Sequence, residues 1–110
     1  MKPQDLVDMK FTIPVFSAAT QMYKCTEVKD YVDVNKKGYE LYLEWIPSSY
    51  NVPLKMRLNI LLSNSNNVDL ILFEKLDSGK YERIHHKIYT RKHISSVKNI
   101  EAALKRLVNG

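Results

Sequence analysis

The sequence predicts an α+β fold, in which an antiparallel sheet of about five strands carries an amphipathic helix on one face. Three observations lead to this prediction. Apolar and polar residues alternate with the period of a strand in several segments between residues 31 and 91. Turn-forming clusters separate these segments at distances typical of hairpins. After residue 93 the apolar residues take up the period of a helix.

The first thirty residues give the weakest signal. We expect residues 1–10 to be a frayed start of the chain. Residues 11–16 are apolar but contain Pro14, which predicts an edge strand or an extended lead-in because proline cannot donate to a ladder. In residues 17–29 Ser17 is a suitable cap for a second helix, whose buried face would include Ala18, Met22, Cys25 and either Val28 or Lys29. The stretch from Met22 to Thr26 also suits a strand, and of the two we expect the helix.

The middle of the chain has the pattern of strands. Residues 31–34 lead into a turn at 35–38, in which Gly38 would supply a positive φ. Residues 39–45 and 54–62 each alternate between an apolar and a polar face. Residues 63–67 form a turn cluster, and residues 68–73 are largely apolar on both faces, which predicts a central strand.

The segment 81–91 follows a turn at Asp77-Ser78-Gly79 and is ambiguous. Its apolar residues fit a helix as well as a strand, and we predict the strand because of the turn upstream and the isoleucine and tyrosine content. In a regular strand Ile84, His86 and Ile88 point one way. The opposite, basic and aromatic face then carries Tyr81, Arg83, His85, Lys87, Tyr89 and Arg91.

The last segment predicts a helix that begins after Ser95 or Ser96, either of which can cap it, and ends near Asn109. This helix has one apolar stripe, which must be buried and for which the sheet offers the obvious surface. The stripe consists of Val97, Ile100, Leu104, Leu107 and Val108.

Length and composition predict a single globular domain over residues 1–110. Cys25 is the one cysteine, so no disulfide can form within the chain. The first residues lack the apolar core of a signal peptide, and no apolar run has the length of a membrane span. We therefore expect an intracellular, cytoplasmic location.

The positive charge is concentrated in the last third of the chain. Residues 1–74 hold eight Lys or Arg and nine Asp or Glu, a net charge of −1. Residues 75–110 hold nine Lys or Arg and three Asp or Glu, a net charge of +6, so the whole excess of +5 lies there. Such asymmetry favours partners that carry negative charge.

The candidate site is the basic and aromatic face that follows the turn at residues 77–79. Lysine and arginine neutralise phosphates, and tyrosine rings provide surfaces on which bases stack. The same charges would suit an acidic protein or, less well, an anionic membrane surface, and a solvated sheet face explains them without any partner. The predicted binding residues are Lys80, Tyr81, Arg83, His85, Lys87, Tyr89, Arg91 and Lys92.

We predict no catalytic residues, no cofactor and no metal site. Adjacent residues of a strand face opposite ways, so His85 and His86 are poorly placed to share a zinc ion, and the chain has no Cys-x-x-Cys pair. Histidines near this face would add positive charge below about pH 6.5. The glycines all serve turns or the end of the chain, which excludes a phosphate-binding glycine loop. Cys25 is expected to be a buried structural thiol.

The ending IYTRKHISSVKNIEAALKRL, residues 88–107, places strands before an amphipathic helix. In element order it is similar to the Alu-domain proteins of the signal recognition particle, to the kinase-associated lipid-binding domain and to single-strand-binding transcription coactivators. The similarity covers the last third to half of the chain and includes no diagnostic motif. It implies an α+β fold, and function has to be argued from the site.

These observations predict a non-catalytic binding module, with single-stranded or structured nucleic acid as its first expected partner. The alternative from another class is a protein-interaction subunit or inhibitor. That protein would bind through an exposed sheet edge, which would also allow a homo- or hetero-oligomer, or through the surface from Tyr42 to Tyr50. Binding to an acidic phospholipid surface is the third expectation.

Overall fold

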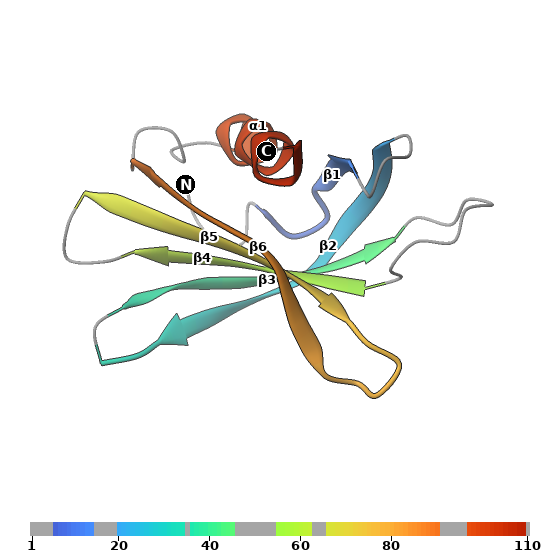
Figure 1. Cartoon of the computed structure of the whole chain (residues 1–110), viewed down its shortest axis with the longest axis horizontal. Coiled ribbons are helices and arrows are strands. Elements are labelled where there is room, and N and C mark those ends of the chain that lie inside the picture. The colour runs from blue at the N-terminus through green and yellow to red at the C-terminus, as the bar shows by residue number, and fades with distance from the viewer. Residues whose placement is uncertain are drawn as a thin grey trace.

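The computed structural model describes residues 6–14, 20–34, 36–45, 55–62, 66–90 and 97–109. These residues form six strands and one helix (Figure 1). The elements are β1 (Lys10–Pro14), β2 (Thr20–Val32), β3 (Lys37–Trp45), β4 (Lys55–Leu62), β5 (Asn67–Lys75), β6 (Tyr81–Thr90) and α1 (Val97–Asn109).

The strands form one antiparallel meander in the order β1-β2-β3-β4-β5-β6, so that each strand pairs with its neighbours along the chain. Pro14 ends β1 at one edge, as expected of a residue that cannot donate to a ladder, and β6 forms the other edge. β5 is an interior strand, as its apolar pattern predicted. The turn before β6 also agrees with the prediction, because Gly79 adopts φ 89° and its N–H donates to the carbonyl oxygen of Leu76 at 2.9 Å.

The hydrophobic core lies between one face of the sheet and α1, which confirms the predicted packing of the helix. Ile100, Leu104 and Leu107 of α1 are buried together with residues such as Leu58 and Leu70 of the sheet. Figure 1 shows α1 above the sheet, where it contacts the two edge strands β1 and β6. We call this the helix side of the sheet, and we call the opposite face, which α1 leaves uncovered, the open face.

The second helix expected over residues 17–29 is wrong for residues 20–29, which belong to β2; residues 17–19 lie outside the described part of the chain. A β-bulge between Cys25 and Glu27 explains the misleading pattern, because the extra residue places Cys25 and Val28 on the same face although they are three apart. That spacing imitates one turn of a helix. Met22, which the helix would have buried, is 44% exposed.

Gly38 serves a different purpose from the one predicted. The chain reverses at residues 33–36, where the Asp33 N–H donates to the Lys36 carbonyl oxygen at 2.7 Å, and Gly38 already lies within β3. A Cβ atom at this position would overlap the carbonyl oxygen of Ile60 on β4. Glycine is therefore needed here for the close approach of two strands, and not for a positive φ.

The frayed start expected over residues 1–10 is wrong for residues 6–10, which are anchored; residues 1–5 lie outside the described part of the chain. Leu6 is fully buried in the core. The N–H of Asp8 donates to the carbonyl oxygen of Cys25, and the N–H of Cys25 donates to the carbonyl oxygen of Met9, both at 2.9 Å. The burial of one leucine side chain and two backbone hydrogen bonds hold this segment against β2. Within the described ranges, no helix has the length and apolar character that crossing a membrane requires.

Candidate functional site

A β-bulge divides the predicted basic and aromatic face between the two sides of the sheet. The register shifts between Leu72 and Phe73, which pair with His85 and Arg83, so that Ile84 has no partner on β5. The alternation of side chains therefore changes phase at Ile84. The prediction of one continuous face is wrong. Before the bulge, Tyr81 and Arg83 lie on the open face. After the bulge, the residues on the helix side are His85, Lys87 and Tyr89.

Tyr89 is a core residue of the helix side and offers no ring face for stacking. It is 8% exposed, and its hydroxyl donates to the carbonyl oxygen of Ala103 on α1 at 3.1 Å. Burial raises the pKa of the Tyr89 phenol, an effect that the nearby Arg106 guanidinium opposes. Exposed Lys87 and Arg106 lie over this ring, with the Lys87 Nζ 5.7 Å and the Arg106 guanidinium carbon 5.8 Å from its centroid.

The open face carries an aromatic and cationic row that crosses four strands. The strand register places Tyr42 of β3 beside Arg57 of β4, Arg57 beside Phe73 of β5, and Phe73 beside Arg83 of β6. Cross-strand partners have Cβ atoms about 5 Å apart, so neighbouring members of the row are in reach of one another. We call Tyr42, Arg57, Phe73 and Arg83, together with Tyr81, the open-face row.

Arg57 is the centre of this row. Its guanidinium carbon lies 4.3 Å from the ring centroid of Phe73 and 4.7 Å from that of Tyr81, which are cation–π distances. Its Nε lies 3.4 Å from a carboxylate oxygen of Glu40. Arg57 is thereby in contact with two rings and one carboxylate, which partly balances its charge.

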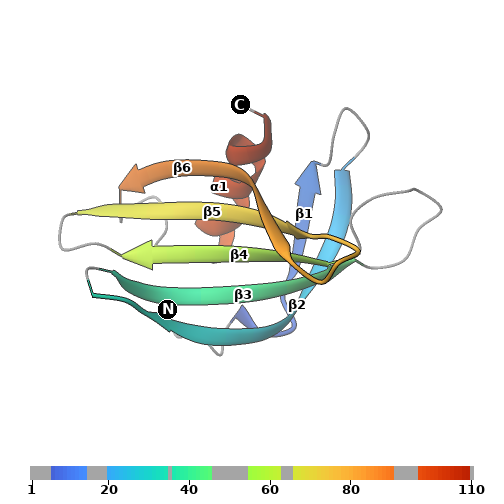
Figure 2. The ribbon, with the colours of Figure 1, turned by 60° about the horizontal axis from the view of Figure 1, so that its bottom comes forward.

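The open face is curved, because the β5–β6 hairpin reaches over it towards β3 (Figure 2). β3 and β6 are separated by two strands in the sheet, yet the rings of Tyr42 and Tyr81 lie 6.3 Å apart at an angle of 75°. This is an edge-to-face contact. Burial raises the pKa of the half-buried Tyr81 phenol; Tyr42 and Glu40 act in the same direction, and the cations Arg57 and Lys29 oppose them.

Cations outnumber carboxylates on the open face. Glu27 lies 3.8 Å from Lys29, and Glu40 pairs with Arg57. Within the described part of the chain, no carboxylate forms an ion pair with exposed Arg83. Arg83 thus presents an unneutralised guanidinium beside the aromatic residues of the row.

The other predicted site residues are scattered. Lys80 is exposed at the β5–β6 turn, where its N–H lies 3.4 Å from the Ser78 hydroxyl. Arg91 and Lys92 lie outside the described residues. Ile88, expected on the apolar face, points to the open face instead and is 56% exposed, because the bulge reverses the alternation there as well.

Sequence reasoning missed Arg57 and Phe73 as members of the site. The alternation in residues 54–62 already placed Arg57 on the polar face of its strand, but nothing in that pattern gave its neighbours. Those neighbours depend on the register of three strand pairs. A pairing prediction that counted the strands outward from the 77–79 turn could have found them.

The two histidines of β6 lie on opposite faces, as predicted, since His85 pairs with Leu72 and His86 with Ile71. Among the described residues, no three His, Cys, Asp or Glu side chains gather in a way that could hold a metal ion. Cys25 is fully buried, and this burial raises the pKa of its thiol to about 11. A thiol with so high a pKa is a weak nucleophile at neutral pH, in agreement with a structural role.

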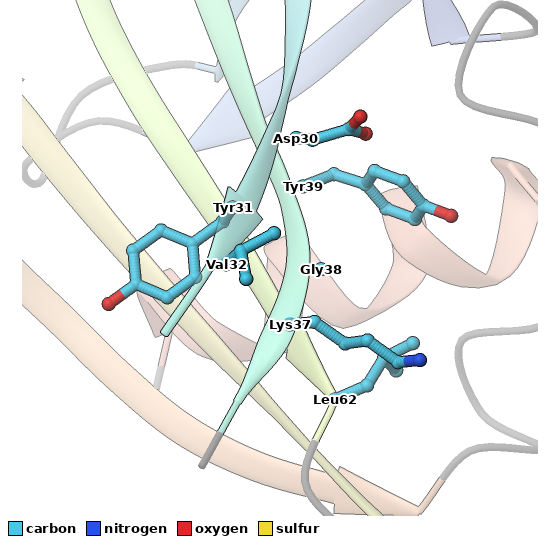
Figure 3. A pocket seen from close by; sticks show the side chains of 7 residues that line it. All are labelled: Asp30, Tyr31, Val32, Lys37, Gly38, Tyr39 and Leu62. Atoms are coloured by element: carbon cyan, nitrogen blue, oxygen red, sulfur yellow. The ribbon is translucent and has the colours of Figure 1, made fainter. Parts of the chain in front are cut away.

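A hollow of about 250 Å³ lies at the end of the β2–β3 hairpin (Figure 3). Asp30, Tyr39, Lys37 and Leu62 line it and point to the same side, while Tyr31 points to the other side. Val32, at its rim, is 82% exposed. The hollow has one carboxylate and one ammonium group, so it lacks the positive excess of the open face.

Comparison with models of protein families, with curated proteins and with solved structures finds no match for the chain.

Proposed function

We propose that this chain is a non-catalytic binding module that binds single-stranded nucleic acid on the open face of its sheet. The observation that carries this proposal is the open-face row, in which cationic and aromatic side chains alternate across four strands. Proteins that bind single strands combine positive charge along the backbone path with rings on which bases stack. The open-face row supplies both.

Each member has a separate role in this proposal. Arg83 is exposed and has no carboxylate partner in the described structure, so it is available to a phosphate. Tyr81 is half-buried at the rim and offers ring surface to a base. Arg57, in contact with Phe73 and Tyr81, keeps those two rings in position and adds positive potential beneath them. The proposal retains Tyr81 and Arg83 from the sequence-based site and leaves Tyr89 as part of the core.

Fluorescence anisotropy with labelled single-stranded RNA and DNA of about ten nucleotides, over a salt series, tests the proposal. Arg83→Ala and Lys87→Ala form a matched pair, because both side chains are exposed cations of β6 and the bulge places them on opposite faces. We expect Arg83→Ala to weaken binding and to lower the salt slope by about 0.7 for each phosphate that the variant no longer neutralises. Lys87→Ala should leave both unchanged. Absence of wild-type binding at low salt would refute the proposal.

A second candidate function, a protein-interaction subunit, is favoured by a different observation. Val32, which lines the hollow with Tyr39 and Leu62, is 82% exposed, and Val34, two residues further along the β2–β3 hairpin, is 93% exposed. Exposed apolar side chains next to a hollow are typical of contact surfaces. A photo-crosslinking residue at position 34 should then give one discrete protein adduct, while the same residue at position 80, in the other hairpin turn, should give none. Equal labelling from both positions would count against this function.

A further inference from the structure

The open face contains a slot at the end nearest the β5–β6 turn. Tyr42 and Tyr81 form its aromatic walls, and its charged lining comes from Glu27, Glu44, Lys55 and Lys75. Its volume is about 160 Å³. Pockets for drug-sized ligands have roughly 300–1,000 Å³, so this slot suits a single ring-sized group.

The two walls differ in what they offer to such a group. The rings of Tyr42 and Tyr81 lie 6.3 Å apart and at 75° to each other. The two rings touch edge to face, so a flat group cannot lie between them. It stacks instead on the outer face of one ring and displaces the lysine that lies over it, which is Lys29 at 5.1 Å from the Tyr42 centroid or Lys75 at 6.0 Å from the Tyr81 centroid. This fixes the plane of the group, and hence the direction in which its hydrogen-bonding edge points.

The slot contains two carboxylates, Glu27 and Glu44, although the proposed ligand of the open face is a polyanion. Glu27 and Glu44 are both exposed, and they would repel a phosphate. The contact of Glu27 with Lys29 is 3.8 Å long with both side chains more than half exposed, so it is weak and easily rearranged. A carboxylate contributes to binding when it accepts a hydrogen bond from the base edge, and Glu or Asp accepts from the N4 amino group of cytosine.

Bases without an amino group cannot make this contact. Uracil has the ring of cytosine but carries a carbonyl oxygen in place of the amino group, and a carboxylate repels that oxygen. Lys55 and Lys75, which also line the slot, are available to the phosphates on either side of the inserted base. We propose that the slot receives one unstacked base and that Glu27 and Glu44 select cytosine over uracil by accepting from its amino group. This inference rests on the proposed function of the open face.

The test compares octamers of cytidine and of uridine by fluorescence anisotropy at one fixed salt concentration. Wild type should bind the cytidine octamer at least about fivefold more tightly, the lower end of the discrimination that base-edge contacts give. In Glu27→Gln/Glu44→Gln the ratio should fall to near one, since a glutamine amide can donate to uracil as well as accept from cytosine. Uridine should bind this variant more tightly than wild type, because two negative charges are gone. Glu82→Gln, an exposed position of β6 on the helix side, should keep the wild-type ratio.

Three results would overturn the inference, and they differ from one another. Equal wild-type binding of both octamers would remove the base preference while the open face remained a nucleic-acid site. A ratio that survives Glu27→Gln/Glu44→Gln would show that other groups read the base. Binding of neither octamer would refute the proposed function itself, and the base preference with it. Thermal melts of each variant, in which these exposed substitutions should change little, confirm that the compared proteins are folded.

Discussion

The two halves of β6 carry similar residues but have different surroundings. Before the bulge, Tyr81 and Arg83 contribute to a surface that water reaches. After it, Tyr89 is buried under α1 with its hydroxyl bonded to a helix carbonyl. One extra residue, Ile84, causes the difference. A run of basic and aromatic residues in a sequence therefore indicates a binding surface only when the alternation of the strand is uninterrupted.

The contrast between a buried and an exposed side holds for the other strands of the sheet as well. The largest expected effect on stability comes from substituting two adjacent residues of β5. Leu70 points to the helix side and is fully buried, whereas Ile71 points to the open face and is only partly buried. Leu70→Ala should lower the free energy of unfolding by about 2–5 kcal/mol, and Ile71→Ala by about 1 kcal/mol. Urea denaturation measures both. Equal losses would contradict the division into a core face and an open face.

The second-largest effect should be the loss of stability at high pH, where the buried groups Cys25 and Tyr23 ionise. Burial raises the pKa of Cys25 from 9.0 to about 11 and that of Tyr23 to about 12, and a negative charge at Glu74 adds to the second shift. A group whose pKa is raised on folding gives stability that is complete below the unfolded pKa and is lost as pH rises through the folded one. The contribution of Cys25 and Tyr23 to the free energy of unfolding should therefore be constant up to about pH 9, and Cys25 alone should remove about 2 kcal/mol by pH 11. In Cys25→Ala the decline should be shallower; an identical decline would assign it to other groups.

Removal of one hydroxyl from each half of β6 should give a smaller and unequal effect. Tyr89→Phe leaves the Ala103 carbonyl without its buried donor, and we expect a loss of about 1–2 kcal/mol in the free energy of unfolding. Tyr81→Phe keeps the ring against Arg57 and should change the free energy by less than about 0.5 kcal/mol. Thermal or urea unfolding of the two variants side by side is sufficient. The reverse order would mean that the bulge lies elsewhere in β6.

The smallest expected effect concerns the geometry of the open-face row. Arg57→Lys keeps the positive charge but loses the planar group in contact with Phe73 and Tyr81. We expect a loss of about 1 kcal/mol in stability. We also expect weaker nucleic-acid binding at an unchanged salt slope, since the two rings would be held less firmly while the charge remains. A changed slope would instead give Arg57 a direct phosphate contact.

The sequence predicted most elements because alternation reports burial directly. β3, β4 and α1 each lie where one face or one stripe is apolar, β5 lies where both faces are apolar, and β6 follows the predicted turn. The helix wrongly predicted at β2 and the continuous face wrongly predicted at β6 coincide with bulges at Cys25–Glu27 and at Leu72–Phe73. A bulge changes the period by one residue without a distinctive residue type, so a single sequence gives little sign of it.

The sequence predicted two members of the open-face row, Tyr81 and Arg83, and missed two others, Arg57 and Phe73. Tyr81 and Arg83 follow a recognisable turn, so their exposure on a hairpin could be inferred from local pattern. Arg57 and Phe73 join them through pairings between strands that are distant in sequence. Cross-strand neighbours follow from register, which depends on the packing of the whole core and not on any one segment.

The most direct test of the division of β6 is a ¹H–¹⁵N correlation spectrum recorded while a single-stranded octamer is added to the full chain. If the open face binds the strand, the shifts should be concentrated at Arg57, Phe73, Tyr81 and Arg83. Signals from Lys87, Tyr89 and Ala103, on the helix side, should stay in place. Shifts confined to Lys87, Ala103 and Arg106 would contradict binding at the open face and move the binding surface to the junction of β6 and α1.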